Sequence, residues 1–171
     1  MKIIEILGVV AVLAGGAMLG GCKAKVTGGG AIRGLEGERA AFTVNLDSCD
    51  DVDHPRGSFL YKDKNRGLSV KGELLEVRLP GDSICDFDGA PASKENTVGA
   101  TATWRSTSPK NPGHGTATIC MTDNGEGRKA DEKDFVSIRL WRDGEAGGAP
   151  FHVNFGSFQG NIQQHECSED L

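Results

Sequence analysis

The strongest constraint on this chain is an alternation of apolar and polar residues that recurs along most of its length. In RAAFTVNL, the side chains of Ala40, Phe42, Val44 and Leu46 share one parity, which is the two-residue period of a half-buried β-strand. The same period recurs in GSFLYK, GLSVKGELLEVRLP, TVGATATW, GTATICMT, DFVSIRLW and PFHVNF, and GNIQQH adds a short last strand. Turn signals rich in Gly, Pro, Asn and Asp separate these segments. The sequence therefore predicts an all-β fold, a single antiparallel β-sandwich or small β-barrel of about eight strands.

The alternation also predicts which side chains face the core. The later strands direct three sets of residues inward: Val98, Ala100, Ala102 and Trp104; Ala117, Ile119 and Met121; and Val136, Ile138 and Leu140. In PFHVNF the inward set is Phe151, Val153 and Phe155, so His152 is expected to face solvent. Between residues 68 and 79 the apolar parity switches beside Gly72, which predicts a β-bulge or a bend.

The first 22 residues read as a bacterial export signal. An apolar and small-residue stretch, Ile6 to Met18, follows Lys2 and is too short to span a bilayer. Leu19-Gly20-Gly21-Cys22 then resembles the lipobox of bacterial lipoproteins. That resemblance implies cleavage before Cys22 and lipidation of its thiol. Two or three acyl chains, such as palmitate, make the attachment stable, because one chain anchors only marginally. The alternative is an ordinary secreted protein with a chance cysteine near its cleavage site.

The residues after Cys22 are Gly-rich and polar, which favours a flexible tether. We therefore expect a signal peptide over residues 1–21, an anchor and tether over 22–36, and one β domain over 37–171. The location expected is the cell envelope. Lys23 stands where Asp is associated with retention in the inner membrane of enteric bacteria, so the outer membrane is favoured in a Gram-negative host. The net charge of −5 gives no electrostatic basis for binding nucleic acid.

Four cysteines remain after cleavage, and an even number in an exported chain predicts two disulfides. They are Cys49, Cys85, Cys120 and Cys167. Three pairings can form, and strand alternation favours Cys49–Cys85 with Cys120–Cys167. Each bridge contributes about 2–4 kcal/mol by restricting the unfolded chain. This contribution matters because aromatic residues make up only 6% of the chain, so the core is modest.

Three segments resemble a known family. TGGGAI (27–32), TATICMTDNGEG (116–127) and GSFQGNIQQH (156–165) are similar in order and spacing to the post-COAP domain of bacterial secreted and surface proteins. The similarity covers about residues 27–165. Ala31 replaces the family's usual aromatic residue, Gly127 follows Glu126 without the usual Pro, and the four cysteines are not a general family feature. The resemblance implies an accessory domain and supplies no catalytic residues. Asn124-Gly125 most simply shapes a turn.

Two acidic segments suggest Ca²⁺ sites, because calcium prefers oxygen ligands. The first has Asp50, Asp51 and Asp53 as its candidate ligands, close to Asp47 and His54. Its spacing differs from a calcium-loop pattern, so a solvated loop held by a disulfide is the simpler interpretation. The second segment contains Asp123, Asn124, Glu126, Asp131 and Asp134, and neighbouring Arg and Lys residues offset its charge. We expect no cofactor.

Catalytic patterns are absent from the sequence. The four histidines, His54, His114, His152 and His165, lack the spacing of a zinc helix. His165-Glu166-Cys167 suits a transition metal only if Cys167 is reduced. No nucleophile elbow occurs, and no pair of carboxylates stands out as a glycosidase pair.

Two tryptophans invite different interpretations. Trp104 continues the apolar face of its strand and is expected in the core. Trp141 lies on the polar face with Arg139, so the two form a candidate partner-binding anchor. Trp141 packed beneath a loop is the alternative.

These features predict a lipid-anchored extracytoplasmic β domain that acts as a binding or structural accessory module without catalysis. Its partners would be the membrane, through the lipid on Cys22, and a protein or cell-wall glycan. The alternatives are an inhibitor or immunity-type lipoprotein that acts on a cell-wall hydrolase, and a metal-dependent hydrolase.

Overall fold

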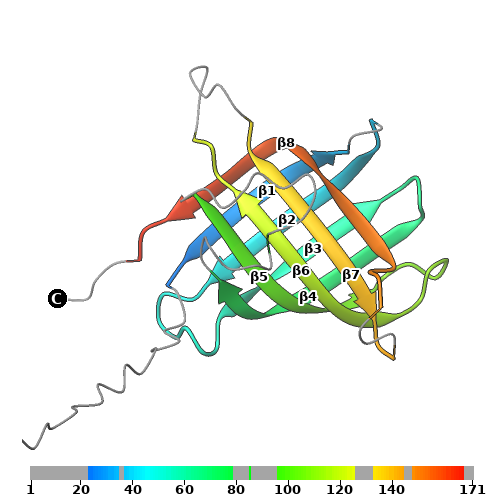
Figure 1. Ribbon diagram of the computed structural model, residues 1–171, viewed down its shortest axis with the longest axis horizontal. Coiled ribbons are helices and arrows are strands. Elements are labelled where there is room, and N and C mark those ends of the chain that lie inside the picture. Colours follow the sequence, from blue (N-terminus) through cyan, green and yellow to red (C-terminus); the bar gives the residue numbers. More distant parts are fainter. Residues whose placement is uncertain are drawn as a thin grey trace, which may run out of the picture.

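The protein is an all-β barrel (Figure 1). The computed structural model describes residues 23–34, 37–78, 85, 96–125, 133–144 and 148–167. These ranges contain the strands β1 (Lys25–Arg33), β2 (Arg39–Asp47), β3 (Arg56–Asp63), β4 (Leu68–Arg78), β5 (Thr97–Ser106), β6 (His114–Thr122), β7 (Phe135–Arg142) and β8 (His152–His165). The expected signal peptide and Cys22 lie outside the described residues.

Each strand pairs antiparallel with the next along the chain, and β8 pairs with β1 to close the barrel. That closing register runs from Lys25 opposite His165 to Arg33 opposite Ser157. The barrel is therefore the correct member of the predicted pair, and the sandwich is wrong. Closure satisfies the backbone groups that two edge strands would leave unpaired.

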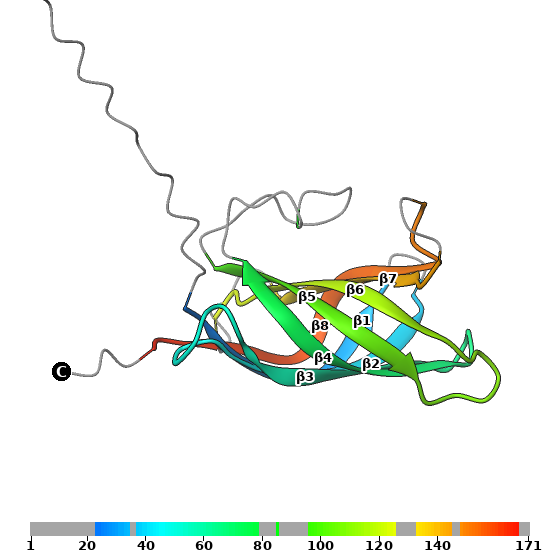
Figure 2. The ribbon, with the colours of Figure 1, turned by 90° about the horizontal axis from the view of Figure 1, so that it is seen from below.

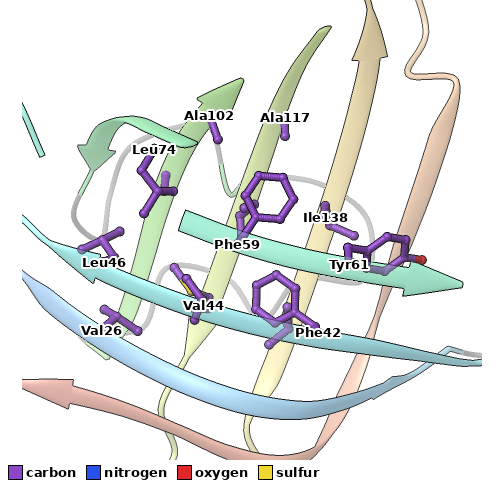
Figure 3. Close-up of a cluster of buried hydrophobic side chains, with 14 of the residues drawn as sticks. Val26, Phe42, Val44, Leu46, Phe59, Tyr61, Leu74, Ala102, Ala117 and Ile138 are labelled. Carbon is purple, nitrogen blue, oxygen red and sulfur yellow. The ribbon is translucent and has the colours of Figure 1, made fainter. Parts of the chain in front are cut away.

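Apolar side chains fill the interior of the barrel. The predicted inward faces of β2, β5, β6 and β7 are confirmed, and Trp104 lies in the core. Figure 3 shows Phe42, Phe59 and Tyr61 projecting from β2 and β3 toward Ala102, Ala117 and Ile138 on the facing wall. Large rings opposite alanines let the two walls approach each other, and Figure 2 shows that the barrel is flattened accordingly.

The irregularity predicted in β4 is present as a shift of register, but it lies at Leu75 and not beside Gly72, which pairs regularly with Trp104. Pairing with β5 slips between Leu74 and Glu76, which leaves Leu75 bulged and 50% exposed. Leu74 and Val77 both remain in the core. The bulge lets a strand whose apolar parity changes keep both halves buried.

The predicted tether over residues 22–36 is wrong for most of its length, because residues 25–33 form β1. Glycine-rich composition suggested flexibility, but here the glycines serve close packing. A Cβ atom at Gly30 would collide with the backbone of Gln159 and Gly160 in β8. Pairing with β2 and β8 on both sides orders the segment.

The predicted orientation of β8 is also wrong. His152 and Asn154 are buried, whereas Val153 and Phe155 are only half-buried. The downstream apolar residues Phe158 and Ile162 share the parity of His152 and are in the core. Since a strand has one register, they carry His152 and Asn154 inward with them.

Two disulfides close the end of the barrel where β1 begins. Cys49 bonds to Cys167 and Cys85 bonds to Cys120, with Cα–Cα distances of 5.3 and 5.9 Å. Two bridges were predicted correctly, but the favoured pairing is wrong. Lys25 pairs with Asp47 on one side and His165 on the other. This places Cys49 and Cys167, which follow those two partners by two residues, at the same rim of the barrel.

Candidate functional site

A hollow of about 520 Å³ lies on the outer wall of the barrel, over β3, β4 and β5. Each strand contributes two outward-facing side chains to it, which follow the alternation of a strand. The lining side chains that face outward are Ser58, Leu60, Lys71, Glu73, Thr103 and Arg105. We refer to this hollow as the β3–β5 groove. Leu60 is 55% exposed within it, and among the described residues Leu75 is the one other large apolar side chain with comparable exposure.

Gly72 lies in the central strand beneath the groove. It faces the core between Phe59 of β3 and Trp104 of β5 but places no side chain there. A Cβ atom at this position would collide with the Phe59 ring and with the Thr103 carbonyl. The ring therefore occupies the space that a side chain of residue 72 would need, and β4 lies close against it. A glycine covered by a neighbouring aromatic ring is a common way to bend a strand.

Two cations face each other across the groove. Lys71 lies directly opposite Arg105, and Leu60 lies opposite Lys71 on the other side. Among the described residues, neither cation has an ion-pair or side-chain hydrogen-bond partner. Like charges opposite each other on neighbouring strands repel. The groove is thus a place where the protein tolerates a local electrostatic cost.

A polar cluster lies inside the barrel, near the end opposite the disulfides. The Tyr61 hydroxyl lies 2.7 Å from His152 Nε2 and accepts a hydrogen bond from Asn154 Nδ2 at 2.8 Å. Burial, with Arg66 nearby, lowers the pKa of His152 to about 4. Burial also raises the pKa of Tyr61 well above its ordinary value. The two groups are therefore neutral at pH 7, and the Tyr61 hydroxyl donates a hydrogen bond to Nε2 when His152 carries its proton on Nδ1.

The first acidic segment forms a self-contained loop. Asp51 accepts hydrogen bonds from the backbone N–H groups of Asp53 and His54, and its other oxygen lies 3.1 Å from His54 Nδ1. The hydrogen bond from His54 is the main reason why the pKa of Asp51 is lowered. The three candidate calcium ligands, Asp50, Asp51 and Asp53, do not converge. Over the ranges that the structure describes, no three His, Cys, Asp or Glu side chains are grouped as metal ligands.

Two carboxylates of the second acidic segment, Asp123 and Asp134, bind the backbone of β8. Asp134 accepts the backbone N–H groups of Asn124 and Ile162, at 3.0 and 2.7 Å. Asp123 accepts those of Gly125 and Gln164, at 2.8 and 2.9 Å. These bonds explain the TDNG motif as a structural feature. Glu126 and Asp131 lie outside the described residues.

The remaining candidates are spread over separate places. Trp141 and Arg139 share the outer face of β7, where Trp141 is half-buried and its indole N–H donates to the Gly148 carbonyl at 3.2 Å. His114 Nε2 lies 3.2 Å from Asp143, and His165 Nε2 lies 3.0 Å from Thr27 Oγ1. Because Cys167 is in a disulfide, His165-Glu166-Cys167 offers no free thiolate.

Sequence reasoning missed the β3–β5 groove because no single segment contains it. Leu60, Lys71 and Arg105 look like ordinary outward positions in three different strands. The available signal was Leu60, an apolar residue of outward parity beside Phe59 and Tyr61. Only the register between strands shows that it lies next to two cations.

Comparison of this chain with protein families, with curated proteins and with solved structures yields no match. Nowhere in the described ranges does the chain form a helix long and apolar enough to cross a membrane.

Proposed function

We propose that this protein is a lipid-anchored, extracytoplasmic accessory module that binds a partner on the outside of its barrel and does not itself catalyse a reaction. One observation carries the proposal. Rings and aliphatic side chains fill the barrel interior, whereas the β3–β5 groove opens on the outer wall. Recognition through the outer wall suits a partner larger than the small ligands that barrels enclose.

The start of the barrel supports attachment close to a membrane. The Ala24 N–H donates to Ser48 Oγ at 2.9 Å, and the Ser48 N–H donates to the Ala24 carbonyl at 2.9 Å. Ser48 is fully buried, so Ala24 is held firmly against the barrel. Only Lys23 separates Ala24 from Cys22, the residue that the lipobox resemblance marks for lipidation. A lipid on Cys22 would hold the disulfide end of the barrel at the bilayer surface.

This geometry makes the groove accessible. Lys71 and Arg105 lie in the halves of β4 and β5 that are remote from Ala24. A barrel attached at Cys22 would therefore hold the β3–β5 groove away from the lipid headgroups. The resemblance of residues 27–165 to post-COAP domains agrees with an accessory role.

Intact mass of the membrane-extracted protein tests the anchor. We expect a chain that begins at Cys22, carries two or three acyl chains and shows four thiols only after reduction. A Cys22→Ala variant serves as the control and should lack the added lipid mass. An unlipidated wild-type chain would remove the membrane from this proposal.

Photo-crosslinking tests the binding role. A photoreactive amino acid is placed at Leu60, Trp141 or Gln163, which lie on three different parts of the outer wall, and the full-length variants are irradiated in the producing cells. A binding module should give a discrete adduct from at least one of these sites. No adduct from any of them would contradict the binding role.

A further inference from the structure

We infer that the β3–β5 groove binds an acidic segment of a protein partner, with a carboxylate between Lys71 and Arg105 and an aliphatic side chain against Leu60. This inference rests on the proposed binding function and names the site and the chemistry that it recognises.

Charge is the first argument. Among the outward-facing side chains that line the groove, Lys71 and Arg105 are cations and Glu73 is the one acid. Lys62 adds a further exposed cation on β3, two residues beyond Leu60. The whole chain carries a net charge of −5, so this patch is opposite in sign to the net charge of the protein. A carboxylate placed between Lys71 and Arg105 would relieve the repulsion across β4 and β5.

Leu60 is the second argument. It lies directly opposite Lys71, so any group that reaches the two cations also passes over an exposed aliphatic side chain. A phosphate or sugar-acid polymer would satisfy the charges but leave Leu60 in water. A polypeptide that presents a carboxylate beside an aliphatic residue covers both features.

The backbone of the groove supports recognition by side chains. β4 is hydrogen-bonded to β3 on one side and to β5 on the other. No strand edge is open here for a peptide to extend the sheet, which excludes recognition by strand addition at this site. The ends of the segment can instead contact the Ser58 and Thr103 hydroxyl groups, which flank Glu73 across the same strands.

The test uses the full-length chain with a photoreactive amino acid at Leu60, irradiated in the producing cells, followed by sequencing of the crosslinked partner peptide. Lys71→Glu is introduced in the same chain. Arg39→Glu is the matched control, because Arg39 is an exposed cation opposite Arg33 and lies outside the groove. Each substitution replaces a pair of like charges with a pair of opposite charges.

We expect a protein adduct whose crosslinked peptide contains Asp or Glu beside an aliphatic residue. Lys71→Glu should reduce the adduct at least tenfold, while Arg39→Glu changes it less than twofold. Both variants should melt at or above the wild-type temperature, since each relieves a repulsion, and this separates lost binding from lost folding.

Several results would overturn the inference. They are an adduct insensitive to Lys71→Glu, a partner peptide without acidic residues, an adduct with a glycan or lipid, and an adduct with a second copy of this chain. Adducts from Trp141 or Gln163 but not from Leu60 would move the binding surface elsewhere and leave the proposed function intact. No adduct from any of the three sites would remove both.

Discussion

At the scale of single residues, one buried hydroxyl group, that of Tyr61, is the hydrogen-bond partner of two polar side chains inside the barrel. Tyr61 bridges His152 and Asn154 across the barrel, since β3 and β8 are not adjacent strands. His152 is 3% exposed, so the folded protein disfavours the protonated form of its ring. The stability of the fold therefore depends on pH. The usual pKa of 6.5 applies in the unfolded chain, and burial lowers it to about 4 in the folded protein.

The pH dependence of stability follows from that difference. The unfolded chain binds a proton at His152 more readily than the folded one, so the stabilisation is complete above pH 6.5 and is lost as the pH falls toward 4. The loss amounts to about 3 kcal/mol. Denaturant unfolding between pH 7 and pH 4 should show this loss in the wild type and much less of it in His152→Gln. His114→Gln, at an exposed position, should follow the wild type. Parallel curves for wild type and His152→Gln would contradict the assignment.

At the scale of elements, β8 is longer than the strand beside it. β7 pairs with β8 only from His152 to Ser157, while β1 pairs with the half that follows. The open side of that second half is closed by two carboxylates, because Asp134 accepts the N–H of Ile162 and Asp123 accepts that of Gln164. Two carboxylates that lie between β6 and β7 in the sequence thus accept backbone N–H groups of β8 that have no neighbouring strand on that side.

Removing one of these carboxylates should weaken the attachment of the second half of β8. Asp134→Ala leaves the N–H groups of Asn124 and Ile162 without their acceptor, and we expect a loss of about 2–4 kcal/mol in the free energy of unfolding. The Ile162 amide should also exchange its hydrogen faster. Asp143→Ala is the control, because Asp143 pairs with His114 at the surface, and it should cost less than about 1 kcal/mol. Equal losses for the two variants would contradict the stabilising role of Asp134 at β8.

At the scale of the whole molecule, strand pairing and disulfides act on the same end. β1 and β8 bring the start of the barrel beside Cys167, and both disulfides lie at that end. The two bridges close loops of different length, since Cys49 and Cys167 are 118 residues apart in the sequence and Cys85 and Cys120 are 35 apart. In the chain-entropy account, a bridge that closes a longer loop restricts the unfolded chain more.

The two bridges should therefore contribute unequally. Replacing Cys49 and Cys167 by Ser should cost about 5 kcal/mol, and replacing Cys85 and Cys120 about 4 kcal/mol. Denaturant unfolding of each double variant measures these losses, and a non-reducing digest verifies the pairing. A larger loss for the Cys85–Cys120 variant would mean that strain or residual structure outweighs loop entropy.

The sequence by itself determined the fold class, strands β2 to β7 and most inward-facing residues, because alternation along one strand is a local property of the chain. The predicted total of about eight strands agrees with the structure only because PFHVNF and GNIQQH, predicted as two strands, are both parts of β8, while β1 was predicted as a tether. It also predicted two disulfides from the even number of exported cysteines. The switch of parity in β4 predicted an irregularity in that strand, although the prediction placed it beside Gly72 and the bulge is at Leu75.

Only the tertiary structure decided what depends on pairing between distant segments. Closure of β1 on β8 turned a Gly-rich stretch into a strand and placed Cys49 beside Cys167. Burial of Phe158 and Ile162 places His152, which has the same parity in β8, in the core, where the Tyr61 hydroxyl is its hydrogen-bond partner. Register across three strands placed Leu60, Lys71 and Arg105 side by side. A single strand specifies which face each side chain takes, but only its neighbours specify what that side chain meets.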